Sequence, residues 1–212
     1  MEQSSHNYDD IIEHGYEFKF EHYFTRGWEL FTQNAGNLYA WMFVGLLIVM
    51  VSAIIPPLLL WTVPAFSAAF YLYLNKAANG EKPVFNDFFQ GFQPAGQLVL
   101  VTLFTAVLVM IGFMLFFLPG IYLAVAFGFG IPLVALGGLS ATDALGVSRK
   151  VITKQWWMFL VMGIVMGLIA QFIPLLSLPF IVCVNYAMFE DIMGSPAELE
   201  SQIDEMGAEG EF

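Results

Sequence analysis

Hydrophobic residues gather in three long runs, 38–75, 97–139 and 156–189, and none of these runs contains a charged residue. A single helix over the second run would be roughly 64 Å long, about twice the thickness of the hydrocarbon layer of a membrane. The other two runs are also too long for one crossing. Each run is therefore predicted to contain two membrane-spanning helices.

Proline and glycine mark where each run divides. Pro56 and Pro57 interrupt the first run, Pro119 and Gly120 the second, and Pro174 the third. Proline removes a backbone donor and clashes with the preceding helical turn, whereas glycine tolerates the positive φ of a chain reversal. These residues are predicted to form the turns of three helical hairpins. The predicted fold is thus an all-α polytopic membrane protein with six transmembrane helices, of which the last is short for a full crossing.

The basic residues predict the orientation of these helices. All seven lie before the first run or between the runs, and none lies in a predicted turn: Lys19, Arg26, Lys76, Lys82, Arg149, Lys150 and Lys154. In a six-span arrangement they fall on one side, which the positive-inside rule assigns to the cytoplasm. Both termini are therefore predicted to be cytoplasmic.

An amphipathic segment precedes each hairpin and is predicted to be a helix lying flat at the membrane surface. The first carries Phe24, Trp28 and Phe31 on one face, the second reads "VFNDFFQGF", and the third opens at Ser140 with a capping-box pattern. Each contains one glycine: Gly27, Gly91 and Gly146. Two interpretations stay open: three copies of one unit with a period of roughly 55 to 65 residues, or the amphipathic borders common in hairpin membrane proteins.

Composition supports the membrane class. Of the 212 residues, 58% are hydrophobic and only 12% are charged, against about one quarter charged in a soluble domain. The net charge of -11 offers no basic surface for nucleic acid. The charges concentrate outside the apolar runs, which predicts an acidic tail at 1–23, a membrane domain at 24–192 and a second acidic tail at 193–212.

The sequence offers no catalytic, cofactor-binding or metal-binding residues, so the protein is predicted not to be an enzyme. The predicted spans contain no ionisable side chain suited to catalysis or proton coupling. His6, His14 and His22 all precede the first run, and their eight-residue spacing would not place them on one helical face. The single Cys183 excludes a disulfide within the chain.

Small and uncharged polar residues are the remaining candidates for a site inside the membrane. The polar candidates could line a solute path, or they could form hydrogen bonds between helices; they are Ser52, Thr62, Ser67, Thr102, Thr105, Gln171 and Asn185. Gly163 and Gly167 form a G-x-x-x-G pattern, and Gly128 lies in the predicted fourth span. These glycines are predicted to allow close helix packing, either within one chain or between chains.

Four stretches resemble a known group of proteins: "RGWELFTQNAGNLYAWM", "NGEKPVFNDFFQGF", "LPGIYLAVAFGFGIPLV" and "DALGVSRKVITKQWWMFL". The group is an uncharacterised family of bacterial multi-span proteins, similar to the membrane domain found with some glycerophosphodiester phosphodiesterases. The resemblance covers roughly residues 16–192 and implies a bacterial inner-membrane protein with six spans. It transfers no catalytic residue, because the phosphodiesterase barrel is a separate soluble domain.

Three classes of function are compatible with these features. The favoured one is a non-enzymatic scaffold or accessory protein in contact with membrane lipids, which binds a protein partner at its cytoplasmic face, where the charges collect. The alternative is a transporter or channel for a neutral or lipid-like solute. An enzyme acting on lipid is the third class, for which the spans offer no nucleophile with a neighbouring base.

Overall fold

The computed structural model describes residues 11, 15–93 and 95–194, and the described residues contain helices but no strand. This confirms the predicted all-α class. The two predicted acidic tails lie largely outside the described residues. In chain order the helices are α2 (Phe20–Ser52), α3 (Pro56–Ala78), the 3-10 helix η1 (Phe85–Phe92), α4 (Ala95–Leu115), α5 (Phe117–Ala126), α6 (Gly130–Gly137), α7 (Ala141–Lys154), α8 (Trp156–Phe172) and α9 (Pro174–Met193).

Several of these helices are long and apolar enough to cross a membrane, so the predicted membrane class holds. Within the described residues there are four such spans: α2, most of α3, α4, and the stretch Phe117–Gly137 that combines α5 and α6. The pair α7 and α8, bent by 96° at their junction, raises the number to five if it counts as one span. The last helix, α9, is not among them.

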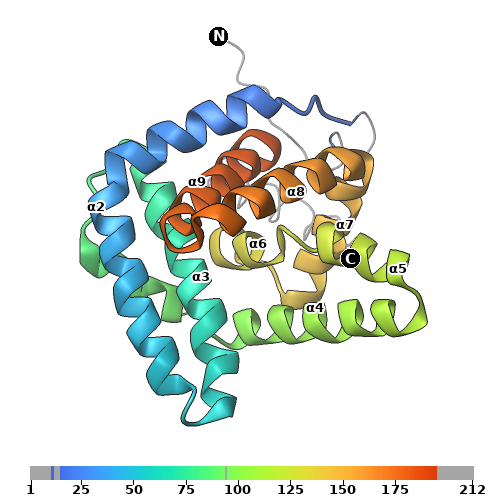
Figure 1. Cartoon of the computed structure of the whole chain (residues 1–212), viewed down its shortest axis with the longest axis horizontal. Helices are drawn as coiled ribbons and strands as arrows, with labels where there is room; N and C mark the ends of the chain where they lie inside the picture. Colours follow the sequence, from blue (N-terminus) through green and yellow to red (C-terminus); the bar gives the residue numbers. More distant parts are fainter. Residues whose placement is uncertain (1–10, 12–14, 94, 195–212) are drawn as a thin grey trace, which may run out of the picture.

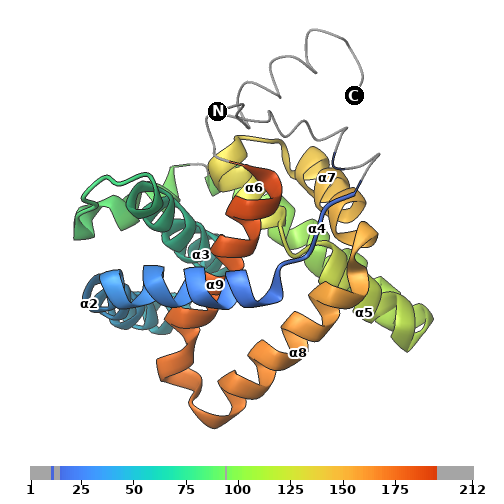
Figure 2. The ribbon, with the colours of Figure 1, turned by 90° about the horizontal axis from the view of Figure 1, so that it is seen from above.

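Three helix pairs extend from a common centre. α2 packs on α3, α4 on α5, and α8 on α9, and the turns of the three pairs point away from one another (Figures 1 and 2). The core between the pairs is rich in aromatic rings. Phe88 of η1, for example, is fully buried and stacks on Trp41 of α2 and on Tyr73 of α3, at centroid distances of 4.9 and 4.2 Å.

Two of the three predicted turns coincide with helix starts. Pro56 and Pro57 open α3, and Pro174 opens α9. Proline suits this position because its fixed φ matches the helix and its missing N–H would have had no intrahelical partner. The chain reverses at residues 53–55 and at Ile173, directly before these prolines.

The structure places the second reversal earlier than the sequence predicted. The chain turns at Phe116, which is extended with φ −168° and ψ 153°, and Pro119 and Gly120 lie inside the first turn of α5. Gly120 does not have a positive φ. A methyl group at Gly112 would lie 2.9 Å from the Cα atom of Gly120, so these glycines let α4 and α5 approach closely.

The amphipathic segments adopt three different forms. The first is the beginning of α2, a continuous helix of 33 residues that bends sharply midway (Figure 1), and a surface position for this part stays a prediction. No proline lies between residues 20 and 52 to stop the helix. The second is the 3-10 helix η1, and the third is α7, which Ser140 caps by accepting a hydrogen bond from the backbone N–H of Asp143 at 3.3 Å.

The segment before α2 docks on the rest of the protein. The phenol of Tyr16 donates a hydrogen bond to the carbonyl of Val151 at 3.3 Å, and its burial raises the pKa of that phenol. The ring of Phe18 lies 5.2 Å from that of Phe159 in an edge-to-face contact. This segment therefore covers the junction between α7 and α8.

Candidate functional site

Acidic and basic side chains at the predicted cytoplasmic side pair with one another. Lys19 lies 3.1 Å from Asp191, and Arg26 lies 3.3 Å from Glu190, so both pairs join the N-terminal part of α2 to the end of α9. These side chains are partly exposed, and such pairs contribute about 1 kcal/mol or less each. Their role within the described residues is to hold two helices together.

A third ion pair fixes η1 on α3. Lys76 lies 2.9 Å from the carboxylate of Asp87, which also accepts a hydrogen bond from the backbone N–H of Val84 at 2.7 Å. The ammonium group of Lys76 and the amide of Val84 hold the pKa of the Asp87 carboxyl below its usual value. Asp87 of η1 is thus paired with a basic residue of the same chain.

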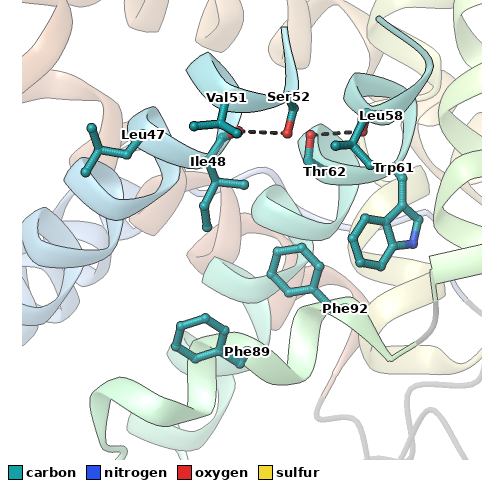
Figure 3. Close-up of a pocket in the computed structure, with 9 residues that line it drawn as sticks. All are labelled: Leu47, Ile48, Val51, Ser52, Leu58, Trp61, Thr62, Phe89 and Phe92. Carbon is teal, nitrogen blue, oxygen red and sulfur yellow. Dashed lines mark hydrogen bonds between the residues drawn. The ribbon is translucent and has the colours of Figure 1, made fainter. Parts of the chain in front are cut away.

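An apolar groove of about 540 Å³ lies between α2, α3 and η1 (Figure 3). Its walls include Leu47 and Val51 of α2, Trp61 of α3, and Phe89 and Phe92 of η1. Two hydroxyl groups also border it, but they donate hydrogen bonds to carbonyls of their own helices, Ser52 to Ile48 at 2.7 Å and Thr62 to Leu58 at 3.1 Å (Figure 3). The groove therefore presents hydrocarbon and aromatic surface to whatever occupies it.

The candidate span Phe117–Gly137 is interrupted at residues 127–129, between α5 and α6. Ser148 of α7, which is fully buried, bridges this break. Its hydroxyl donates to the carbonyl of Ala126 at 2.8 Å and accepts from the backbone N–H of Phe129 at 3.1 Å. Non-helical backbone is tolerated at membrane depth only where protein or a cavity satisfies its polar groups, and Ser148 supplies that here.

Three cavities meet at Gly128, in the middle of this break. The α3 cavity, of about 260 Å³, lies between Phe66, Ser67 and Tyr71 of α3 and Ile131 of α6. Gly128 belongs to the lining of all three cavities.

The α4 cavity, of about 340 Å³, is bordered by Thr102, Thr105 and Ala106 of α4 and by Gly128. The α8 cavity, of about 210 Å³, lies between Gly128, Met162 of α8 and Asn185 of α9. Gly128 is therefore part of a wall that the three cavities share, and a methyl group added to it would lie 3.6 Å from the side chain of Ile152 on α7.

Polar side chains in these walls differ in their hydrogen bonds. Ser67 donates to the carbonyl of Val63 at 3.1 Å, and Asn185 to that of Ile181 at 3.1 Å. By contrast, the hydroxyl oxygen of Thr102 is buried and has no hydrogen-bond partner among the described residues. A buried hydroxyl without a partner is costly, so Thr102, which borders the α4 cavity, would gain stability from a hydrogen bond with a ligand. Trp41 Nε1 is likewise buried without a partner among the described residues.

The three glycines that were predicted to allow helix packing, Gly128, Gly163 and Gly167, have different surroundings in the structure. Gly128 lies at the break, where an added methyl group would be 3.1 Å from the carbonyl oxygen of Val125. Gly163 and Gly167 are exposed on α8, and a methyl group on either would meet no atom within 4 Å. Neither glycine makes a close contact within the described residues, although Gly163 borders the α8 cavity, and packing between chains stays a prediction.

The candidate polar residues also divide. Gln171 is exposed near the end of α8 and borders none of the cavities described. The others border the three cavities (Ser67, Thr102, Thr105 and Asn185) or the apolar groove (Ser52 and Thr62). Sequence reasoning missed Ser148 and the helix break. The stretch "AFGFGIP", with two glycines and a proline inside an apolar run, was the signal that could have found the break.

Neither a metal centre nor a family assignment emerges. The described residues contain no group of three His, Cys, Asp or Glu side chains that could hold a metal ion. Comparisons with protein-family models, with characterised proteins and with solved structures find no match.

Proposed function

We propose that this protein binds a neutral or lipid-like molecule between its membrane helices and carries it through the membrane. The observation that supports this function is the meeting of three cavities at Gly128, where the helix is broken and the hydroxyl of Thr102 lacks a partner. Broken membrane helices line the binding sites of many transporters, because their free backbone groups and gaps accommodate a solute.

The lining of the cavities limits the charge of the solute. Among the residues that the structure describes, no Asp, Glu, Lys, Arg or His borders any of the three cavities. An ion would therefore lack a counter-charge, and a buried unpaired charge is costly in a membrane. A largely apolar molecule with a hydroxyl or carbonyl group fits better, since it could bond the hydroxyl of Thr102.

The proposed setting is a bacterial inner membrane with six spans in three hairpins and both termini in the cytoplasm. The one-sided distribution of Lys and Arg and the resemblance to bacterial multi-span proteins support it. In this proposal α8 and α9 form the fifth and sixth spans, with Glu190 and Asp191 at the cytoplasmic end of α9.

A non-enzymatic scaffold acting at the cytoplasmic face, the function favoured from sequence, is a weaker proposal. The charges that would recognise a partner there are in part already engaged, in the pairs of Lys19, Arg26 and Lys76. We assign no catalytic role to any residue.

The test is movement of a fluorescent phospholipid or of a neutral amphiphile across the bilayer of liposomes that contain the purified protein. Gly128→Leu should abolish the activity, because its Cβ atom would lie 3.1 Å from the carbonyl oxygen of Val125 and the larger side chain would displace the wall that the three cavities share. Gly167→Leu is the matched control, since it adds the same side chain to an exposed position of α8. If the wild-type protein moves no such molecule, or if both variants behave alike, the transport proposal is wrong and the scaffold takes its place.

A further inference from the structure

The structure contains three similar units arranged as a closed ring. Unit 1 covers residues 20–78, unit 2 residues 85–137 and unit 3 residues 141–193, and each begins with its amphipathic segment. The segment of unit 2, η1, packs on α3 of unit 1, and that of unit 3, α7, packs on α5 and α6 of unit 2. The segment of unit 1, at the start of α2, packs on α9 of unit 3 and so closes the ring.

The interface between η1 and α3 combines a close glycine contact with an ion pair. A methyl group at Gly91 would lie 2.5 Å from the carbonyl oxygen of Ala65 and 2.8 Å from the Cα atom of Ala69. Four positions before the glycine, Asp87 pairs with Lys76, which lies seven positions after Ala69. The backbones of the two helices are therefore locked at two levels.

The interface between α2 and α9 repeats this arrangement in the same register. A methyl group at Gly27 would lie 2.9 Å from the Cα atom of Val184. Four positions before the glycine, the phenol of Tyr23 donates to Asp191 at 3.0 Å, and Asp191 lies seven positions after Val184. The chemistry of the polar pair differs from that of the second unit, but its place is the same.

Two glutamines occupy matching places in the ring. Gln97, at the start of α4 in unit 2, accepts a hydrogen bond from the backbone N–H of Ala141, where unit 3 begins, at 2.9 Å. Gln155, at the start of α8 in unit 3, donates to the carbonyl of Tyr16, just before unit 1, at 3.2 Å. In both cases the first long helix of one unit holds the beginning of the next.

The interface between α7 and unit 2 departs from this pattern. Gly146 of α7 corresponds to Gly27 and Gly91, but a methyl group there would meet nothing within 4 Å. Ser148 instead bonds both sides of the helix break at residues 127–129. Side-chain contacts, among them the hydrogen bond between Tyr122 and Thr153 at 2.8 Å, complete this interface, whereas close backbone contact holds the other two.

We infer that the interface between α7 and the α5–α6 break is the movable joint of the ring and that Ser148 holds it closed. Opening of this joint separates α6 from α5 and gives access to the cavities around Gly128. The inference rests on the proposed function, because it concerns entry to the same cavities. Residues 127–129 act as the hinge, since their backbone is already outside the helix.

The test measures opening of the joint without any ligand. Leu145 of α7, which is buried against Gly130 of α6, is replaced by cysteine in a Cys183→Ala background, and its reaction with N-ethylmaleimide is followed in detergent. The thiol reacts as its thiolate, which forms only when the joint opens to water. Ser148→Ala removes two hydrogen bonds, each worth about a threefold shift in equilibrium in membrane proteins, so the labelling rate should rise about tenfold.

Two further variants keep the result interpretable. Ser148→Thr retains the hydroxyl group and should label at nearly the wild-type rate, whereas a general loss of packing would raise its rate as well. Tyr23→Phe removes the hydrogen bond at the α2–α9 interface and should leave labelling unchanged. Equal rates for Ser148→Ala and wild type, or an equal rise in Tyr23→Phe, would overturn the inference. A rise confined to Ser148→Ala in a protein that moves no lipid would support the joint and refute the proposed transport.

Discussion

Replacing Gly91 with alanine should separate η1 from α3. The added methyl carbon would lie 2.5 Å from the carbonyl oxygen of Ala65 and 2.7 Å from the backbone nitrogen of Ala69. Both atoms belong to the backbone of α3 and cannot rotate away. Since non-bonded carbon contacts are comfortable near 3.5 Å, η1 must move outward by about 1 Å.

The cost of this movement can be worked out from the contacts that it loosens. Overpacking of a well-packed core typically costs about 1–3 kcal/mol. Displacement of η1 also disturbs the stacking of Phe88 between Trp41 and Tyr73, and each such aromatic pair is worth about 0.5–1.5 kcal/mol. We therefore expect Gly91→Ala to lower the free energy of unfolding by about 2–4 kcal/mol.

Gly146→Ala provides a control with the same chemical change. Gly146 lies inside α7, where a methyl group meets no atom within 4 Å. Alanine is more favourable than glycine in a helix by about 0.8–1 kcal/mol, so this variant should be slightly more stable than the wild type. The assay is equilibrium unfolding in mixed micelles with increasing SDS, followed by circular dichroism. If Gly91→Ala is as stable as the wild type, the close contact between η1 and α3 is wrong.

Three further predictions concern single interactions. Asp87→Asn should lower the free energy of unfolding by about 1 kcal/mol at pH 7. Because the pKa of Asp87 is lowered in the folded state, the wild type keeps this extra stability above the ordinary carboxyl pKa of about 3.9 and loses it as the pH falls through the lowered pKa. Unfolding curves of both proteins from pH 7 to pH 3 test this, and a difference in stability that does not change with pH would contradict it. Tyr73→Phe should cost about 0.5–1.5 kcal/mol in the same SDS assay, since it removes the hydrogen bonds of the phenol with Asn37 and Asn34 while keeping the ring on Phe88; an unchanged unfolding midpoint would contradict those bonds. Replacing both Gly163 and Gly167 with isoleucine should change the free energy of unfolding by no more than about 0.5 kcal/mol, because a methyl group at either position meets no atom within 4 Å. Light scattering then tests packing between chains, and a dimer that the double variant disrupts would support it.

Local rules explain most of the helix boundaries that the sequence predicted correctly. Pro56 and Pro174 start helices because proline fits the first helical turn and cannot continue the preceding helix. Ser140 caps α7 because its hydroxyl reaches the N–H of Asp143 three residues later. These features depend on neighbours in the chain, so they can be read from a short stretch of residues.

The contacts of several glycines could not be predicted from the sequence, because they depend on helices that are far away in the chain. Gly27 and Gly146 look alike in sequence, yet Gly27 touches the backbone of Val184 and Gly146 touches nothing within 4 Å. Gly163 and Gly167 match a packing motif, but a methyl group on either would meet no atom within 4 Å. A glycine allows close approach wherever it lies, and only the path of the other helices decides whether something approaches.

The sequence by itself determined that this protein is helical, that it belongs in a membrane, and that prolines open α3 and α9, because hydrophobic runs and proline geometry act locally. Only the tertiary structure decided that the second reversal falls at Phe116, that α5 and α6 are separated by a break, and that Ser148 bridges that break from α7. The physical reason is that a break inside an apolar run is stable only when a distant side chain satisfies its backbone groups. The serine that does so lies 19 residues beyond Phe129 and belongs to a different helix.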